Sequence, residues 1–239
     1  AQAISVIDLA TATLTATIPT GLALNNQIIR ITPDKSHAIA AIQNGVIFVD
    51  LTSGVVDANI NTGTVGDIEI TADGKYAFVS NFNARVIDIA TRTLVKTITF
   101  AACNDAAVSP TQNRAVALNN RFREDIQLYD VNGAAGFFEG RALTGEPQEG
   151  DATRTLALSP DGRTLIAANN TSRTAAIIDL DARAVSGYVP TGERSLGVAF
   201  SPDGKTAVVC NADDDTVNII DVALGQTVKT LSVTSRPGE

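Results

Sequence analysis

The chain has 239 residues, of which 44% are hydrophobic and only 5% aromatic, with no Trp and no Met. This length suits one large all-β domain, whose core must be built mainly from Val, Ile, Leu and Ala. Its 18 Lys and Arg against 26 Asp and Glu leave a formal charge of −8, which repels nucleic acid and anionic membrane surfaces. No stretch approaches the ~20 apolar residues of a membrane span. We therefore expect neither nucleic-acid binding nor membrane insertion.

Two short patterns recur along the chain and share one period. The first, apolar residues followed by Asp and another apolar residue, occupies residues 6–9, 48–51, 86–89, 128–131, 177–180 and 219–222. The second, Ser/Thr-Pro-Asp-Gly in its full form, occupies residues 32–35, 71–74, 109–112, 159–162 and 201–204. Pro and Asp favour the corners of a hairpin turn, and Gly takes the left-handed position that closes it. Lys35 and Gln112 stand at the Gly position, which predicts a different turn type there.

The fifth unit shows the elements of one repeat most clearly. Residues 196–200 are predicted to form strand one, 207–210 strand two, 217–221 strand three and 227–233 strand four. Strand two is apolar on both faces, as expected between stacked sheets. Strand four alternates between polar and apolar residues, as expected of an exposed edge strand. A four-stranded unit repeated about every 40 residues is typical of a β-propeller blade. The sequence therefore predicts an all-β propeller of four-stranded antiparallel blades.

The repeats divide one predicted propeller domain, residues 1–239, into blades. Residues 1–20 supply strands three and four of a half blade, and complete blades are predicted at 24–62, 63–101, 102–148, 149–190 and 191–233. Propellers usually close by sharing one blade between the two ends of the chain, which removes exposed sheet edges. Because the half blade has no partner strands, we expect either a piece of a longer ring or an irregular closure. Its edge is a candidate for pairing with another chain.

Residues 201–211 followed by 216–221 resemble the YVTN-type repeat of bacterial and archaeal surface-layer and secreted propellers, and this resemblance extends over essentially the whole chain. It implies a propeller fold and an extracellular, cell-surface or periplasmic location. Related propellers include lactonase-like enzymes, subunits of quinoprotein dehydrogenases and proteins without known chemistry, so the resemblance leaves the activity open.

The loops before strand one and after strand two open on the same end of a blade, where a binding site is expected. Asn and Arg are frequent in these loops, and Asn44 is one of them. We expect a polar ligand or partner to be bound by Asn26, Asp67, Asn81, Asn104, Asp105, Asn119, Arg121, Arg154, Asn169, Arg194 and Asn211. The alternative is that Asn simply suits left-handed turn conformations after a strand.

Other candidates for chemistry receive structural interpretations. Asp213 and Asp215 belong to an acidic run that lacks the spacing of a calcium loop, so a solvated turn is favoured and no metal site is predicted. The recurring strand-three aspartates are expected to cap the following turn through its backbone N–H groups. His37 begins strand two at the opposite end of the blade and is expected to be a surface residue. Cys103 and Cys210 lie two blades apart, which predicts two free thiols.

The first functional hypothesis is a non-enzymatic propeller that binds a protein or glycan partner, without a cofactor, through its loop face. The second is a hydrolase similar to propeller lactonases, in which Arg154, Arg194, Asp67 and Asp105 bind and activate a small sugar lactone. A propeller subunit of a redox complex is a third. The predicted rim contains almost none of the His, Glu and metal ligands on which the enzymes of the family depend.

Overall fold

The computed structural model describes residues 3–80, 83–99, 103–109, 111, 116–120, 126–130, 138–139, 153–169 and 172–234. Of these, residues 25–27, 99, 103–105, 116–120, 126–130, 138–139 and 153–154 are described by their backbone alone. The chain forms two compact units, residues 1–99 and 100–239, and each is treated by itself. In the described ranges the regular elements are β-strands, and none is a helix long and apolar enough to cross a membrane.

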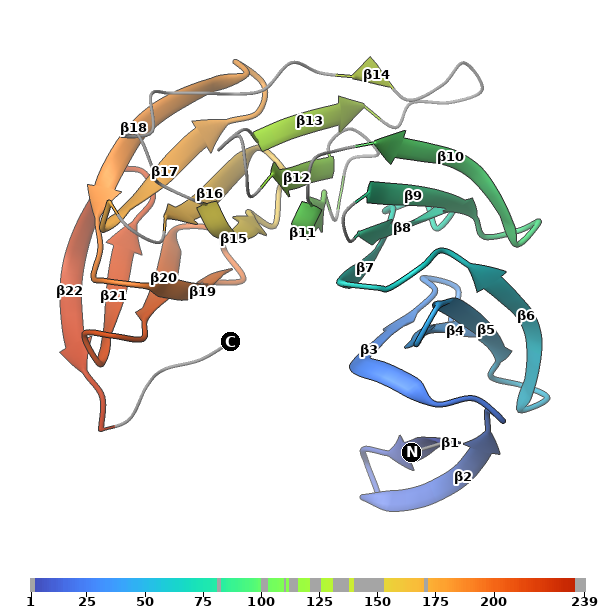
Figure 1. Ribbon diagram of the computed structural model, residues 1–239. Coiled ribbons are helices and arrows are strands. Elements are labelled where there is room, and N and C mark those ends of the chain that lie inside the picture. Colours follow the sequence, from blue (N-terminus) through green and yellow to red (C-terminus); the bar gives the residue numbers. More distant parts are fainter. Residues whose placement is uncertain are drawn as a thin grey trace. The chain divides into compact units, whose positions relative to one another are not determined.

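Unit 1 contains three antiparallel sheets (Figure 1). The first pairs β1 (Ala3–Asp8) with β2 (Thr13–Pro19). The second has the order β3 (Leu24–Ile31), β4 (His37–Ile42), β5 (Gly45–Asp50) and β6 (Val55–Asn61). The third has β7 (Asp67–Ile70), β8 (Tyr76–Ser80), β9 (Asn83–Asp88) and β10 (Thr93–Thr99) side by side.

Unit 2 also contains three antiparallel sheets, each with its strands in sequence order. The first holds β11 (Cys103–Val108), β12 (Val116–Asn120), β13 (Ile126–Asp130) and β14 (Phe138–Glu139). The second holds β15 (Thr153–Leu158), β16 (Thr164–Asn169), β17 (Thr174–Asp179) and β18 (Ala184–Pro190). The third holds β19 (Ser195–Phe200), β20 (Thr206–Asn211), β21 (Thr216–Asp221) and β22 (Gln226–Ser232). The four strands predicted for the fifth unit are confirmed to within one residue at each end.

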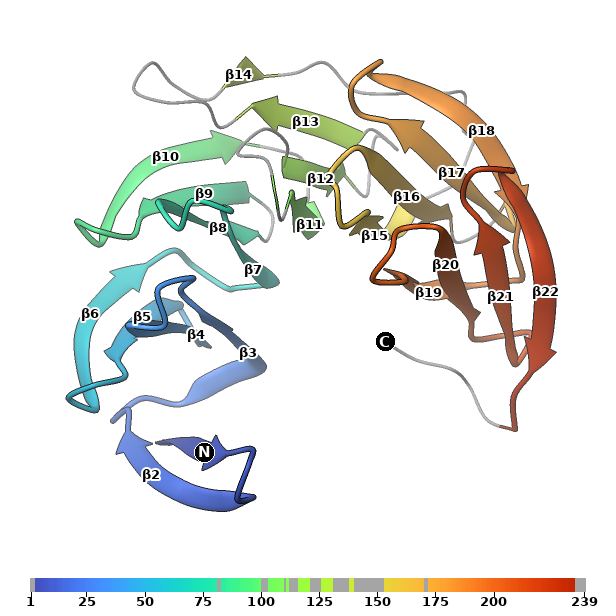
Figure 2. The same ribbon diagram turned by 180° about the vertical axis from the view of Figure 1, so that it is seen from behind.

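The core lies between neighbouring sheets. Because successive side chains of a strand point to opposite faces, β4 sends Ile39 to one neighbour and Ala40 to the other. Ile39 and Phe48 pack against the third sheet of unit 1, whereas Ala40 and Ile47 pack against β1 and β2, where Ile4 is buried. In unit 2 the sheets β15–β18 and β19–β22 stack face to face in the same way, as the reverse view shows (Figure 2). This stacking confirms strand two as a strand that is apolar on both faces.

Each four-stranded sheet, hereafter a blade, has two chemically different ends. Antiparallel order places the strand-two-to-three loop and the four-to-one connection at one end, which we term the loop end. The one-to-two and three-to-four turns lie at the other, the hairpin end. Strands β3 and β7 form edges of consecutive blades on the same side of unit 1, with β6 and β10 on the opposite side (Figure 1).

The Ser/Thr-Pro-Asp-Gly hairpin is held by one hydroxyl and one carboxylate. The Ser201 hydroxyl donates to Asp203 at 2.6 Å and accepts the Thr206 N–H at 3.1 Å, while the Lys205 N–H donates to Asp203 at 3.1 Å. The same three contacts recur around Thr32, Thr71 and Ser159. These bonds fix the turn without using the side chain at its fourth position.

The different turn type predicted at Lys35 is wrong. Lys35 has a φ of +60°, close to the +69° of Gly74 and the +70° of Gly204. Its N–H donates to the Thr32 carbonyl at 2.7 Å, as the Gly204 N–H does to the Ser201 carbonyl at 2.9 Å. The shared hydroxyl–carboxylate bonds therefore impose the left-handed conformation on a lysine. The second exception, Gln112, lies outside the described residues.

The capping role predicted for the strand-three aspartates is confirmed where their side chains are described. Asp50 accepts the N–H groups of Thr52 at 2.7 Å and Ser53 at 2.8 Å. Asp8, Asp88, Asp179 and Asp221 make equivalent bonds to the turns that follow them. Turn capping thus accounts for the regular spacing of these carboxylates, without any role in catalysis.

The half blade differs from the others in the exposure of one repeated apolar position. The Ile7 side chain is 56% exposed, whereas Val49, Ile87, Ile178 and Ile220 at the same repeat position are 0% exposed. In the described structure β1 pairs only with β2, while the equivalent strands β5, β9, β17 and β21 each have two neighbours. Val49 and Ile87 pack against the sheet that precedes their own, whereas among the described residues no sheet covers the face of β1 that carries Ile7.

Candidate functional site

A charged cluster lies on the innermost strands of unit 1. Arg30 projects from β3, and Asp67 and Glu69, two residues apart on β7, share one face of that strand. The Arg30 Nη2 atom lies 3.1 Å from Asp67 Oδ1 and 2.9 Å from Glu69 Oε1. One guanidinium therefore bridges two blades and two carboxylates. The predicted site residue Asp67 is part of this cluster.

Burial sets the protonation of the cluster. Desolvation raises the pKa of Glu69 above its usual range, the Arg30 hydrogen bond opposes this, and the negative charge of Asp67 adds to it. Two carboxylates facing one cation carry a net charge of −1 when both are ionised, so a proton binds there more readily than on an isolated Glu. The cluster can consequently hold or release a proton on Glu69 beside an Asp67–Arg30 ion pair.

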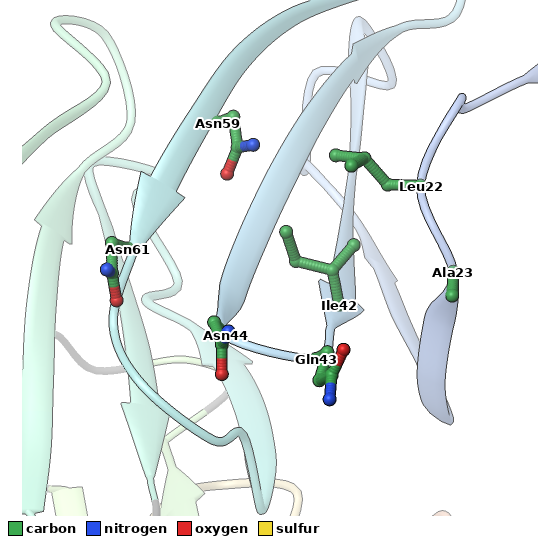
Figure 3. Close-up of a pocket in the computed structure, with 7 residues that line it drawn as sticks. All are labelled: Leu22, Ala23, Ile42, Gln43, Asn44, Asn59 and Asn61. Carbon is green, nitrogen blue, oxygen red and sulfur yellow. The ribbon is translucent and has the colours of Figure 1, made fainter.

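A second feature of unit 1 is a pocket of about 320 Å³ at the loop end. Four side-chain amides and three apolar residues line it: Leu22, Ala23, Ile42, Gln43, Asn44, Asn59 and Asn61. Figure 3 shows Leu22 and Ile42 reaching into the middle of this group, with Asn59 on the β6 side and Gln43 and Asn44 at the turn between β4 and β5. The pocket thus joins the four-to-one connection to the strand-two-to-three loop, which are the segments where the sequence predicts a site.

In unit 2 two predicted site residues make hydrogen bonds within their own blades. Asn169 is 6% exposed and donates to Thr174 Oγ1 at 3.2 Å. Asn211 is fully buried, donates to Thr216 Oγ1 at 3.0 Å, and accepts from the Ser195 hydroxyl at 3.1 Å. This repeated amide–hydroxyl bond ties the end of strand two to the start of strand three. Asn211 therefore presents no free surface to a ligand.

The alternative explanation, left-handed turn conformations, does not apply to Asn169 and Asn211. Among the described non-Gly residues with positive φ there is no Asn; the set is Ala12, Lys35, Arg92, Arg173, Arg183, Arg194 and Asp215. Each of these two asparagines instead bonds to the hydroxyl at the start of strand three. Arginine, not asparagine, is the frequent residue at the left-handed turn positions.

The loop end of the last blade is closed by charged contacts. Arg194, a predicted site residue, lies with its Nη1 atom 3.1 Å from Asp213 Oδ1. The Glu193 N–H donates to Asp214 Oδ2 at 2.8 Å, and the Glu193 carboxylate pairs with Arg173. Asp213 and Asp214 thus serve different partners, and Asp215 is an exposed turn residue with a φ of +50°. In the described part of the chain no group of three His, Cys, Asp or Glu is placed to hold a metal ion.

Several predicted site residues have side chains that the structure does not describe. Asn26, Asn104, Asp105, Asn119 and Arg154 belong to strands whose backbone is described, and Asn81 and Arg121 lie outside the described residues. Their grouping at the loop end stays a prediction.

His37 is not the surface residue that the sequence predicts. Its side chain is 17% exposed, with Nε2 3.1 Å from Asp57 Oδ2 and 2.8 Å from Arg92 Nη2. Nδ1 lies 2.7 Å from the Ser36 hydroxyl. Strand β6 and the β9–β10 turn cover the ring, which the repeat position alone does not reveal. His37 is nevertheless at the hairpin end, as predicted, away from the pocket.

The prediction of a free thiol is confirmed for Cys210, which is partly buried and has its pKa raised by desolvation. The side chain of Cys103 is not described, so its thiol state stays a prediction.

Sequence reasoning missed Arg30, Glu69, Gln43, Asn59 and Asn61. Arg30 and Glu69 each lie among apolar residues of a first strand. A charged residue within a strand predicted to be in the core is the sequence feature that could have indicated this cluster. Asn59 and Asn61 belong to strand four, which reads simply as an exposed edge.

Comparisons with known proteins agree with the architecture. The family described as Lactonase, 7-bladed beta-propeller, matches residues 82–186, a stretch that covers less than half of the chain. No curated protein sequence matches the chain. The matched stretch contains Asp105, Arg154 and Asn169 but neither the charged cluster nor the pocket of unit 1.

Solved structures give broader matches. Dihydro-heme d1 dehydrogenase NirN in complex with DHE is 19% identical with a TM-score of 0.80, over 99% of this chain and 53% of that one. Hydrazine synthase of Kuenenia stuttgartiensis is 20% identical with a TM-score of 0.70, over 88% and 67% of the two chains. The β-propeller domain of Cps50 from Myceliophteria thermophila is 15% identical with a TM-score of 0.68, over 83% and 68%. The chain spans about half the length of the first of these proteins, and it folds as a β-propeller of four-stranded antiparallel blades.

Proposed function

We propose that this chain is a non-enzymatic propeller of the YVTN type that binds a protein or glycan partner through its loop end, outside the cell or at its surface. The observation that carries the proposal is the pocket of unit 1. It opens where the connection before β3 meets the β4–β5 turn, and side-chain amides supply its polar lining. Concave, partly apolar sites with a few polar groups are where proteins usually bind ligands.

The polar groups at the two ends of the blades differ in whether they are already hydrogen-bonded, which supports placing the binding site at the loop end. At the hairpin end the carboxylates are occupied by hydroxyl and backbone N–H groups of their own turns. At the loop end of unit 1 the amides of Gln43, Asn44 and Asn59 make no side-chain hydrogen bond to another described residue. Hydrogen-bonding capacity is therefore available at the loop end.

The test measures binding of a glycoprotein that carries neutral glycans by biolayer interferometry with the chain immobilised. Asn44→Arg places a charge at the pocket, and Ala10→Arg places the same charge at the hairpin end of the half blade. We expect binding that Asn44→Arg abolishes and Ala10→Arg preserves. Binding that survives Asn44→Arg, or that only Ala10→Arg removes, would contradict the proposal.

The charged cluster favours a second candidate, hydrolysis of a small sugar lactone. The family match over residues 82–186 and the raised pKa of Glu69 beside Asp67 and Arg30 support it. In such a reaction Asp67 takes a proton from the attacking water, and Arg30 stabilises the developing oxyanion. Glu69 gives its proton to the ring oxygen as the C–O bond breaks, so that a hydroxy acid leaves.

A pH-stat assay over a panel of aldonolactones tests this second candidate. If it is correct, Glu69→Gln and Asp67→Asn each lower the rate of acid release about 100-fold or more, as loss of a general acid or base does. Asp181→Asn, in an exposed turn of unit 2, should leave the rate unchanged. The binding proposal predicts no acid release above the rate without protein.

A further inference from the structure

We propose that the pocket of unit 1 binds a neutral, hydroxyl-rich ligand, namely one or two uncharged sugar rings of a glycan. This inference rests on the proposed function that the loop end is the binding face. It goes further by assigning the ligand class and the residues that recognise it.

The pocket forms where the repeat is altered. In the second and third blades of unit 2, Asn169 and Asn211 end strand two and bond to Thr174 and Thr216 at the start of strand three. At this repeat position the blade β3–β6 has Ile42, which is 7% exposed. The amide–hydroxyl bond is thus replaced by an apolar side chain that forms part of the pocket lining.

The loop is also shorter. In the second and third blades of unit 2 four residues, 170–173 and 212–215, separate strands two and three. In unit 1 two residues separate them, Gln43 and Asn44 in the blade β3–β6 and residues 81–82 in the blade β7–β10. In the last blade the longer loop reaches the four-to-one connection, where Asp213 pairs with Arg194 and Asp214 accepts the Glu193 N–H. The shortened loop has no residues in the corresponding positions. The space between loop and connection is consequently left open.

Gly45 keeps the short turn against strand four. A Cβ atom on Gly45 would lie 2.1 Å from the Ile60 carbonyl oxygen and 3.0 Å from the Thr62 N atom. Only glycine permits this close approach of two backbones. The turn therefore holds Gln43 and Asn44 beside Asn59 and Asn61, so the four amides form one lining.

The amides match the hydrogen-bonding needs of sugar hydroxyls. Each carboxamide offers an acceptor oxygen and two donor hydrogens, and a hydroxyl needs both partners. Asn61 accepts the Gly63 N–H at 3.1 Å through its Oδ1 atom, and its NH₂ group makes no hydrogen bond to another described residue. Leu22 and Ile42 supply the apolar surface that the C–H groups of a sugar ring require.

The absence of charged side chains from the pocket lining favours an uncharged ligand. None of the seven lining residues is ionisable, so a carboxylate or ammonium on the ligand would lose water without gaining a counter-charge. The formal charge of −8 further disfavours acidic glycans. The volume of about 320 Å³ lies at the lower end of the range of small-molecule sites, about 300–1,000 Å³. A small neutral saccharide fits both conditions.

Isothermal titration calorimetry with defined trisaccharides tests the inference. The neutral probes are maltotriose, cellotriose and the N-acetylated trimer triacetylchitotriose, and trigalacturonate is the acidic probe. We expect a neutral probe to bind and trigalacturonate not to bind. Asn59→Leu should weaken the neutral probe roughly tenfold, the loss typical of one or two hydrogen bonds. The matched control is Thr97→Leu, an exposed residue at the same repeat position on β10.

The outcomes separate this inference from the proposed function. Loss of affinity in Asn59→Leu with unchanged affinity in Thr97→Leu supports the saccharide site. No binding of a neutral probe, or equal affinity in Asn59→Leu, overturns it. Binding of a glycoprotein that persists after enzymatic removal of its glycans also overturns it, although the loop-end function then stands. Ring opening of a lactone overturns the proposed function itself.

Discussion

At the scale of single residues, Lys35 is a strained position that the other repeats allow to be compared with Gly. A non-Gly residue in the left-handed region costs about 1–2 kcal/mol, and Lys35 has a φ of +60° where three other repeats have Gly near +70°. We predict that Lys35→Gly raises the free energy of unfolding by up to about 1 kcal/mol, because the entropy of Gly in the unfolded chain offsets part of the relief. Urea denaturation measures this. Lys35→Ala keeps the strain, so equal stabilisation by Ala would show that the lysine charge, and not the backbone, was the cause.

The hairpin aspartates predict how the fold responds to acid. The Thr32 hydroxyl and the Ser36 N–H and hydroxyl lower the pKa of Asp34 to about 2, and hydrogen bonds likewise lower those of Asp161 and Asp203. An Asp with a depressed folded-state pKa stabilises the fold above its unfolded pKa of about 3.9, and that contribution is lost as the pH falls through the folded-state value. Stability should therefore fall between pH ~4 and ~2.

Carboxyl-carbon NMR across this pH range checks the prediction site by site. Asp34 should titrate near 2, and Ser201→Ala should return Asp203 towards the usual value because its first hydrogen-bond donor is lost. Asp34 titrating near 4 in the folded chain would show that the hairpin hydrogen bonds do not hold in solution.

At the scale of elements, a cluster at the hairpin end joins two blades of unit 1. Asp57 on β6 pairs with Arg92 in the β9–β10 turn at 2.6 Å, and His37 on β4 lies within 3.1 Å of both side chains. Arg92 and Asp57 are each about one-third exposed or less, with side-chain values of 31% and 28%. Charge-assisted bonds in such surroundings contribute more than surface ion pairs.

We predict that Arg92→Ala lowers the free energy of unfolding by about 1–2 kcal/mol, the worth of a partly buried charge-assisted bond. Arg183 is the matched control because it occupies the same turn position, with the same φ of +54°, and is exposed. Chemical denaturation of the two variants gives the comparison. Equal effects of Arg92→Ala and Arg183→Ala would mean that the inter-blade contacts add nothing to stability.

Much of the element level follows from the sequence. The recurring aspartates and Ser/Thr-Pro-Asp-Gly turns predict blade, strand order and capping, because turn geometry and period-2 burial are local properties. Lys35 shows the limit, since hydrogen bonds from neighbouring residues override a side chain's own preference. Asn211 shows another, because a polar residue at a strand end serves either a ligand or an internal hydroxyl, and only the structure distinguishes the two.

The pocket itself could be foreseen only in part. Asn44 marks the loop end in the sequence, but Asn59 lies on strand four and reaches the pocket through the register of β5 and β6. A comparison with the last two repeats could have indicated the pocket. Relative to those repeats, Ile42 replaces Asn and the loop that follows is two residues shorter. The depth of a pocket depends on packing between segments that no single repeat contains.

At the scale of the whole molecule, the proposed binding site and the hydrogen-bonded turns lie at opposite ends of the blades. In both units the hairpin end holds hydrogen-bonded aspartates, and in unit 1 it also holds the His37–Asp57–Arg92 cluster. The loop end of the last blade is closed by ion pairs, whereas that of the blade β3–β6 is open and lined by amides. This division lets the loop end change without loss of the fold, as expected for a binding surface carried by a repeat scaffold.

The most direct test of binding at the loop end is an amide NMR titration of the ¹⁵N-labelled chain with an equimolar mixture of the three neutral trisaccharides. We expect the largest chemical-shift changes on residues 43–45 and 59–61, at the β4–β5 turn and the end of β6. Changes centred on β7 around Asp67 and Glu69, or no changes at all, would contradict it.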